Sequence, residues 1–233
     1  MRKMKAKYSE ELKTAIRAAR LAGRMLMKNF GRPSGLKMKG KMDFSLKADR
    51  DAEKIIIGIL KKKFPEYAVL AEESGKSGDS DYLWIIDPLD GTHNYAFGVP
   101  IFGTVIALQH KNEVVIGVIF LPFLNELYYA EKGRGAFMNG KRISIGTKGR
   151  FVSFGGTHRF TDKIVSKSMV KIAENYHPRL RFIGSAAFSS AYVSIGRIAA
   201  YVVFFSSPWD IAAGALLVEE AGGSALDKAK AAA

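Results

Sequence analysis

The sequence contains no cysteine, and Gln109 is its only glutamine. The absence of cysteine excludes disulfides, thiolate metal sites and thiol nucleophiles. No apolar run reaches the roughly 18 residues of a membrane-spanning helix, and the basic N-terminus lacks the apolar stretch of a signal peptide. We therefore expect a cytoplasmic protein with no membrane partner.

The net charge of the 233 residues is +14, and it is unevenly distributed. Residues 1–63 carry 19 Lys and Arg against 6 Asp and Glu, whereas residues 64–100 carry 1 against 7. A basic protein can attract nucleic acid or acidic metabolites, although a solvated, soluble surface explains the same excess. The acidic segment is more informative, because carboxylates concentrated within a basic chain favour cation binding.

The spacing of apolar residues divides the chain into two halves. Helical periodicity over residues 8–30 and 49–64 is followed by short apolar runs that predict a largely antiparallel sheet. The predicted strands of this half cover residues 67–71, 82–87, 101–109, 113–121 and 126–130. We expect an N-terminal α+β lobe over residues 1–137 that carries most of the candidate metal ligands.

The second half alternates between strand and helix patterns, which is typical of an α/β layer. Predicted strands cover residues 151–156, 181–184 and 199–205, and predicted helices cover residues 162–175, 186–197 and 209–223. We expect these elements to form a C-terminal α/β lobe over residues 138–233, which carries Asp210.

The stretch LWIIDPLDGTHNY places two aspartates, Asp87 and Asp90, directly after an apolar run. Pro88 fixes φ in the turn between them, so both carboxylates can point to one side with the Leu89 carbonyl between them. Such hard oxygen ligands suit Mg²⁺ or Mn²⁺. Taken alone, the motif is explained equally well by a turn in which each aspartate accepts a backbone amide.

Further acidic residues lie at the edges of predicted elements: Glu72 and Glu73 after a strand, and Asp49 and Asp210 at helix starts. Taken singly, solvated glutamates and helix-capping aspartates explain them. Gathered in one place, these charges would repel one another unless cations neutralised them. A pocket that holds two or three divalent ions suits phosphoryl transfer, because the metals bind phosphate oxygens and activate a water.

The stretch WIIDPLDGTHNYAFGVP, together with AEESG, ADRDAE and WDIAAGALLVEEAGG in the same order, resembles the inositol monophosphatase family. That family belongs to the lithium-sensitive phosphatase superfamily, which includes the fructose-1,6-bisphosphatases, and the resemblance covers most of the chain. It implies a layered αβαβα sandwich of the sugar-phosphatase type. The expected fold class is therefore α+β / α/β, with a mainly antiparallel N-terminal sheet and a smaller mixed C-terminal sheet.

The resemblance also implies cofactors and residue roles. Two or three Mg²⁺ ions, or Mn²⁺, would be held by Glu72, Asp87, the Leu89 carbonyl, Asp90 and Asp210. Thr92 and Asp49 would orient the attacking water, with Glu73 as a supporting partner. The backbone amides of Gly91 and Thr92 would face the phosphate, and the substrate would further contact His93, Gly184, Ala186 and Asp210.

The sequence departs from the family pattern in two places. Inositol-specific members carry a sugar-contacting glutamate where this chain has Val203, which weakens the case for inositol monophosphate as the main substrate. Members usually continue beyond the position of Gly223 into another strand and helix. We therefore expect a C-terminal sheet that is shortened or has its edge covered by a partner subunit.

The expected activity is metal-dependent hydrolysis of a sugar or polyol phosphate, of the inositol monophosphatase type and sensitive to lithium. Fructose-1,6-bisphosphatase activity and a 3′-phosphonucleotide-type phosphatase are alternatives. A non-enzymatic alternative is an RNA- or transcription-associated protein that binds through the basic residues 1–63. The carboxylate set would repel nucleic acid, so the expected partners are a small phosphate ester and a second copy of the chain.

Overall fold

The computed structural model describes residues 8–32, 34–35, 37–38, 44–146, 149, 151–156, 163–176 and 179–226. Its N-terminal helices are α1 (Glu10–Asn29) and α2 (Lys47–Lys63), and the short strands β1 (Lys37–Met38) and β2 (Phe44–Ser45) pair between them. The helix α1 begins after Ser9, whose side chain accepts the Leu12 amide at 3.2 Å. Both helices confirm the sequence predictions.

A large sheet follows in the chain, with strand order β10-β9-β8-β7-β6-β5-β3-β4. Its strands are β3 (Ala68–Ala71), β4 (Gly75–Ser77), β5 (Tyr82–Asp90), β6 (Gly103–His110), β7 (Glu113–Leu121), β8 (Glu126–Glu131), β9 (Gly135–Met138) and β10 (Lys141–Ile143). All neighbours pair antiparallel except β3 and β5, so the expected mainly antiparallel sheet is confirmed. The Gly-rich segments that form β4, β9 and β10 have no apolar alternation, and their strands were not predicted.

The second sheet has the order β12-β11-β13, and all three strands run parallel. They are β11 (Phe151–Gly155), β12 (Arg179–Phe182) and β13 (Ala200–Val203). The expectation of a mixed C-terminal sheet is therefore wrong for the described strands. Right-handed crossovers through helices favour parallel pairing, and the helices that separate these strands are α4 (Lys163–Tyr176) and α5 (Ala186–Ser194).

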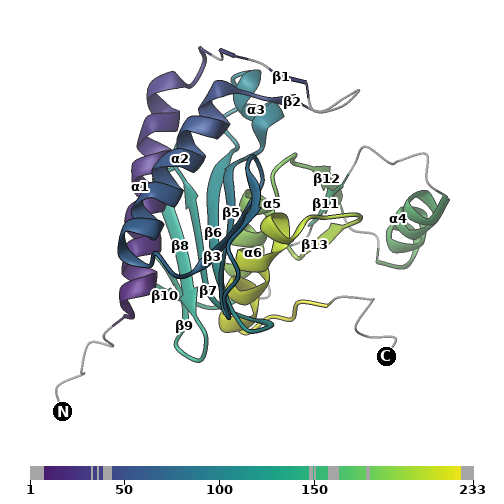
Figure 1. The fold of residues 1–233 in the computed structure, drawn as a ribbon. Helices are drawn as coiled ribbons and strands as arrows, with labels where there is room; N and C mark the ends of the chain where they lie inside the picture. Colours follow the sequence, from purple (N-terminus) through teal and green to yellow (C-terminus); the bar gives the residue numbers. More distant parts are fainter. Residues whose placement is uncertain are drawn as a thin grey trace.

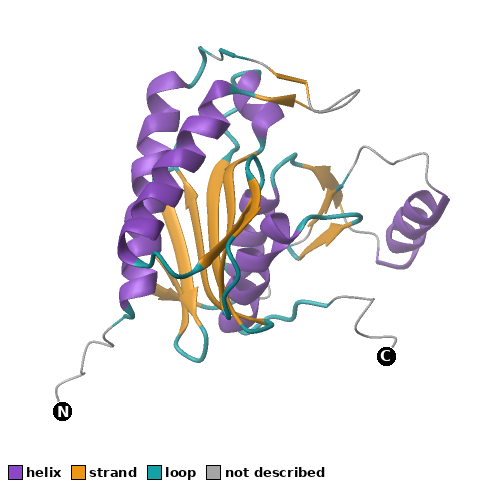
Figure 2. Cartoon of the chain, in the orientation of Figure 1, coloured by secondary structure: helices purple, strands orange, loops and turns teal. Residues whose placement is uncertain are grey.

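The helices and sheets stack in layers (Figure 1, Figure 2). Helices α1 and α2 cover one face of the large sheet, and α5 and α6 (Pro208–Glu220) cover the other. The small sheet lies beyond α5 and α6, and α4 lies past it in Figure 1. This order confirms a layered α/β sandwich.

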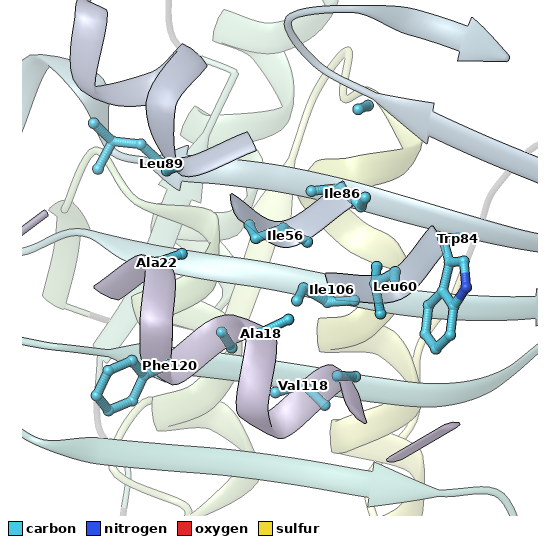
Figure 3. Packing of buried hydrophobic residues seen from close by; sticks show 14 of the residues in the cluster. Ala18, Ala22, Ile56, Leu60, Trp84, Ile86, Leu89, Ile106, Val118 and Phe120 are labelled. Atoms are coloured by element: carbon cyan, nitrogen blue, oxygen red, sulfur yellow. The ribbon is translucent and has the colours of Figure 1, made fainter. Parts of the chain in front are cut away.

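Separate hydrophobic clusters fill the spaces between the layers. Beneath α1 and α2, Ile56, Leu60 and Ile106 belong to the same buried cluster as Trp84, and Leu60 lies next to the indole (Figure 3). On the opposite face, the backbones of β7 and α6 pack closely at Gly117. A Cβ atom at this position would lie only 2.7 Å from the Ala213 oxygen, so the close packing requires glycine. Because α6 lies this close to the sheet, its N-terminal residues are brought near the end of β5.

The proposed lobe boundary between residues 137 and 138 falls within β9, and β9 and β10 both pair with the large sheet. The division into two lobes remains a prediction. Among the described residues, no helix combines the length and apolar character needed to cross a bilayer.

Candidate functional site

The Asp-Pro-Leu-Asp motif forms an irregular end of β5. Asp87 pairs with Val105 and Asp90 with Gly103 of β6, and the register shifts between them. The Leu89 amide donates to Asp87 Oδ1 at 3.0 Å, which is the local turn interaction considered from the sequence. The shift leaves both aspartates on a buried stretch of backbone at the end of the sheet, with exposed fractions of 2% for Asp87 and 7% for Asp90.

Gly91 turns the chain from β5 into the short helix α3 (Thr92–Ala96). Its φ of +85° is in the left-handed region, and a Cβ atom there would lie 2.9 Å from the Ile101 oxygen. A side chain at this position would therefore be both strained and obstructed. The glycine places the Thr92 side chain immediately beyond the two aspartates.

Asp90 joins β5 to α5. Its Oδ1 accepts the Ala186 amide at 3.0 Å, and its Oδ2 accepts the Ala187 amide at 3.0 Å and the Ser185 hydroxyl. A carboxylate at a helix N-terminus is stabilised by the unpaired amides and the helix dipole. Burial nevertheless raises the pKa of Asp90 to about 7, with the charge of Asp210 adding to the rise and the hydrogen bonds opposing it.

Asp49 and Asp210 occupy equivalent places in α2 and α6. Asp49 Oδ2 accepts the Leu46 amide at 2.8 Å, and Asp210 Oδ2 accepts the Ser207 amide at 2.7 Å. Each carboxylate thus reaches back to the residue before its helix, so the capping interpretation is confirmed. Capping uses one oxygen of each side chain and leaves the second for another partner.

The second oxygen of Asp49 meets Thr92. The Thr92 hydroxyl lies 3.1 Å from Asp49 Oδ1 and 3.0 Å from the Leu89 oxygen, so these two acceptors share its single proton. Burial raises the pKa of Asp49 to about 6, and the charge of Glu73 raises it further against the lowering effect of the hydrogen bonds.

Asp87 lies among the remaining carboxylates. Burial raises its pKa well above the usual value, and the charges of Glu72, Asp90 and Asp210 raise it further, together with a side-chain hydrogen bond to Glu72. These side chains come from the end of β3, from β5 and from α6, so the fold brings together acids that are distant in the sequence. We refer to Glu72, Asp87, Asp90 and Asp210 as the carboxylate cluster.

The Glu72–Glu73 pair is held beside β5 by its backbone. The Glu72 amide donates to the Ile86 oxygen at 3.2 Å, which continues the β3–β5 pairing by one residue. The Glu73 amide donates to Glu53 Oε2 of α2 at 2.9 Å. Both glutamate side chains are half-buried, so they are less solvated than a surface pair.

The carboxylate cluster fits hard divalent cations in its chemistry but is not yet closed into a coordination sphere. Within the described ranges, no three His, Cys, Asp or Glu side chains are already arranged to hold an ion. The mutual effect on the pKa of Asp87 shows that the cluster is nevertheless close enough for strong repulsion. Asp87, Asp90 and Asp210 each direct an oxygen to a backbone amide. Modest side-chain rotation toward a cation would relieve the repulsion.

Three of the residues predicted to contact substrate lie in α3 and around the start of α5: His93, Gly184 and Ala186. Gly184 has a φ of +72°, and its oxygen is 3.3 Å from the Asn94 side-chain nitrogen of α3. The same nitrogen lies 2.9 Å from the Ile183 oxygen, so α3 is tied to the loop before α5. His93 is exposed on α3, and the Ala186 amide is directed to Asp90.

Several residues at the site were not among the predicted ones. Ser185 donates to Asp90, Asn94 joins α3 to the loop before α5, and Glu53 accepts the Glu73 amide. Tyr201 of β13 has its pKa raised by burial and then by the charges of Asp90 and Asp210. Only Ser185 carried a usable signal, as a serine directly before a predicted helix.

Comparison with known proteins gives a family and close relatives. The model of the inositol monophosphatase family matches residues 7–231. The chain is 38% identical to a fructose-1,6-bisphosphatase/inositol-1-monophosphatase of Thermotoga maritima, over 94% of this chain and 85% of that protein. It is also 38% identical to an inositol-1-monophosphatase of Mesorhizobium japonicum, over 93% of this chain and 85% of that one.

Other relatives bear a different name. The chain is 37% identical to Nus factor SuhB of Escherichia coli K12, over 93% of this chain and 84% of that protein. Among solved structures, the extragenic suppressor protein suhB of Bartonella henselae superposes with a TM-score of 0.87 at 35% identity, over 94% of this chain and 88% of that one. The Thermotoga maritima inositol monophosphatase superposes with a TM-score of 0.82 at 37% identity, over 92% and 84%.

Proposed function

Because the chain belongs to the inositol monophosphatase family, we propose that it is a Mg²⁺-dependent hydrolase of small phosphate monoesters, with a sugar or polyol phosphate as substrate. The observation that carries this proposal is the carboxylate cluster, in which Asp87 is buried among three other acids. A buried cluster of like charge is costly unless it binds cations.

We propose the ligand assignment that the resemblance to the family implies. Glu72, Asp87 and the Leu89 carbonyl would hold one ion, and Asp87, Asp90 and Asp210 would hold a second, with Mn²⁺ as a substitute for Mg²⁺. Bound ions of this kind neutralise phosphate charge, lower the pKa of water and stabilise the leaving oxygen. Asp87 would contribute to both ion sites, and its place among the other three acids supports this assignment.

Thr92 and Asp49 would handle the proton of the attacking water. With its hydrogen directed to Asp49 Oδ1, the Thr92 oxygen keeps lone pairs that can accept a hydrogen bond from that water. As the water oxygen attacks phosphorus, a proton can pass to Thr92 Oγ1 while the threonine proton passes to Asp49. The alcohol oxygen would leave with the electron pair of its bond to phosphorus and take up a proton from solvent water. An Asp49 pKa of about 6 suits a base that works near neutral pH, and Glu73 sustains that value through its charge.

The substrate would lie between α3 and the start of α5. The amides of Gly91 and Thr92 would bind phosphate oxygens where the glycine allows close approach of the backbone. His93, Gly184, Ala186 and Asp210 would contact the remainder of the molecule. Ser185 and Asn94 position these groups through Asp90 and Ile183, respectively.

The identity of the alcohol is decided near β13. Val203 supplies no carboxylate to bind a sugar hydroxyl, so we propose a substrate range broader than inositol monophosphate that includes fructose 1,6-bisphosphate. A relative named for both activities supports this range. A 3′-phosphonucleotide is the next substrate class to compare.

The test is phosphate release from a panel of inositol monophosphates, fructose 1,6-bisphosphate and a 3′-phosphonucleotide, with Mg²⁺, Mn²⁺ or EDTA and with or without Li⁺. We expect metal-dependent release that Li⁺ inhibits, and kcat/KM ranks the substrates. Absence of phosphate release from every compound at all metal concentrations would contradict the proposal.

We further propose that the protein acts as a cytoplasmic homodimer of two-lobed subunits. Phe97 and Phe123 are 77% and 48% exposed, and such apolar surface is often covered in an assembly. Light scattering coupled to size-exclusion chromatography distinguishes a dimer from a monomer directly.

A further inference from the structure

The outward face of α1 carries a continuous row of cations. Its members are Lys13, Arg17, Arg20, Arg24 and Lys28, and we call this row the basic stripe. The spacing of three or four residues places successive members on one side of the helix. All five are exposed, and from the rise of the helix the row is about 22 Å long.

The basic stripe has almost no local counter-charge. Lys13 pairs with Glu10 at 2.7 Å, but within the described residues Arg17, Arg24 and Lys28 form no ion pair. The sequence contains no acidic residue between Leu12 and Arg32. A surface on which both signs of charge are interspersed is enough for solubility, so solubility does not require a row of cations alone.

The row works against the stability of its own helix. Like charges three or four residues apart repel, and the stripe contains four such neighbouring pairs. A shallow hollow of about 480 Å³ is lined by Lys13, Arg17, Arg20 and Arg24 together with Ile16 and Leu21.

We propose that the basic stripe on α1 binds the phosphate backbone of a nucleic acid. The row is as long as about six phosphate steps of one duplex strand, and its arginines can bind phosphate oxygens in pairs. Binding of this kind recognises backbone charge and not base sequence.

The chemistry of the stripe favours nucleic acid over an anionic membrane. A helix that lies in a membrane surface inserts large apolar side chains beside its cations. Of the large hydrophobic residues that are exposed in the described chain, none belongs to α1 or α2. The apolar residues of α1 are instead directed into the core against the large sheet.

The structure also removes the objection that the carboxylate cluster would repel a polyanion. The cluster lies at the end of β5 and at the N-termini of α5 and α6, whereas the stripe lies on the solvent side of the outermost helix layer (Figure 1). The two surfaces can therefore bind different molecules. This inference goes beyond the proposed hydrolase and does not depend on it.

The test uses the full chain in EDTA, with a labelled 20-nucleotide single-stranded RNA that lacks terminal phosphates, so that the carboxylate cluster offers no competing site. Fluorescence anisotropy gives Kd at several salt concentrations. If all five cations contact phosphate, log K should fall with log salt with a slope near −3.5. The double variant Arg17→Gln/Arg24→Gln should flatten this slope by about 1.4 and weaken binding at least about 10-fold at low salt.

The matched control is Lys163→Gln/Lys167→Gln, which removes the same charge from exposed positions of α4, on the far side of the molecule in Figure 1. We expect this control to leave the slope unchanged, and phosphate release by both variants to equal that of the unmodified protein. An equal loss in the control, or the absence of salt-dependent RNA binding, overturns the proposal. Binding to phosphatidylserine vesicles that depends on the stripe, without RNA binding, assigns the surface to membranes and overturns it as well.

Discussion

The carboxylate cluster and the basic stripe both concentrate charge of one sign, but they do so in different surroundings. The cluster gathers acids from separate elements into a site where Asp87 and Asp90 are 2% and 7% exposed. The stripe takes its cations from one helix and leaves them in water. Burial makes repulsion strong in the first case, and solvent screens it in the second.

This difference predicts how strongly a ligand at each surface would change the stability of the protein. Burial raises the pKa values of the acids at the site, to about 7 for Asp90 and to about 6 for Asp49. Exposed like-charge neighbours on a helix cost only about 0.2–0.5 kcal/mol per pair. A bound cation should therefore change the stability of the protein markedly, whereas neutralising the stripe should change it little.

The largest expected effect comes from Asp87→Asn. The asparagine oxygen can still accept the Leu89 amide, and its nitrogen can donate to Glu72, so a buried charge is removed while its hydrogen bonds are retained. We expect metal-dependent phosphate release to fall about 10³-fold or more, equivalent to about 4 kcal/mol. In EDTA the variant should be at least as stable as the unmodified protein.

Steady-state assays of phosphate release measure the loss of activity in Asp87→Asn, and thermal unfolding in EDTA measures its stability. Glu66→Gln, at an exposed position outside the cluster, is the control for loss of one acid. Retained activity in Asp87→Asn would show that the buried aspartate is not a ligand. A marked loss of stability would show that its charge supports the fold.

The second prediction separates proton transfer from metal binding. Thr92→Val keeps the shape of the side chain but removes the hydroxyl that lies between Asp49 and the Leu89 oxygen. We expect kcat to fall about 10²-fold, at the lower end of general acid–base effects, with little change in the Mg²⁺ concentration for half-maximal activity. Thr92→Ser, which restores the hydroxyl, should recover most of the activity, and a failure to do so would contradict the assigned role.

The third prediction concerns pH and stability. Between the usual aspartate pKa of 3.8 and the folded value of about 7, folded Asp90 holds more proton than the unfolded chain does. Without metal, stability should therefore fall as pH rises through this window. Mg²⁺ at about 100 times its Kd should restore about 2.7 kcal/mol above pH 7, or about 5–10 °C in Tm.

The Mg²⁺-dependent rise in Tm should diminish as pH falls through 7 toward 5, because protons then compete with the metal for the same oxygens. Differential scanning fluorimetry at pH 5 and pH 8, with Mg²⁺ or EDTA, gives the four values needed. A rise in Tm that is the same at both pH values would show that the metal binds elsewhere.

The smallest expected effect comes from Arg24→Glu in the basic stripe. The glutamate would lie four residues from both Arg20 and Lys28, so two repulsive pairs become attractive. We expect a stabilisation of about 0.5–1 kcal/mol, seen as a shift of the urea midpoint at low salt, which high salt reduces. A loss of stability at this exposed position would show that Arg24 supports the fold through contacts other than charge.

The helices and the principal strands could be predicted because their apolar residues recur with the period of each element. Helix α1 and strand β7 agree with the expected ranges almost to the residue. The strands β4, β9 and β10 could not, since each has only three or four residues, too few to show a period, and only their neighbours in the sheet define them. The wholly parallel order of β11, β12 and β13 also depends on how the helices between them return the chain.

The sequence alone placed Asp87, Asp90, Glu72, Asp49 and Asp210 at the edges of regular elements, because apolar periodicity marks where those elements begin and end, and it predicted them as site residues. It also determined the spacing of the basic stripe. Only the tertiary structure decided that Asp90 caps α5, that Asp49 lies beside Thr92, and that α1, which carries the stripe, lies on the opposite face of the large sheet from α5 and α6. These are long-range relations set by the layers of the sandwich, and periodicity along the chain carries no information about them.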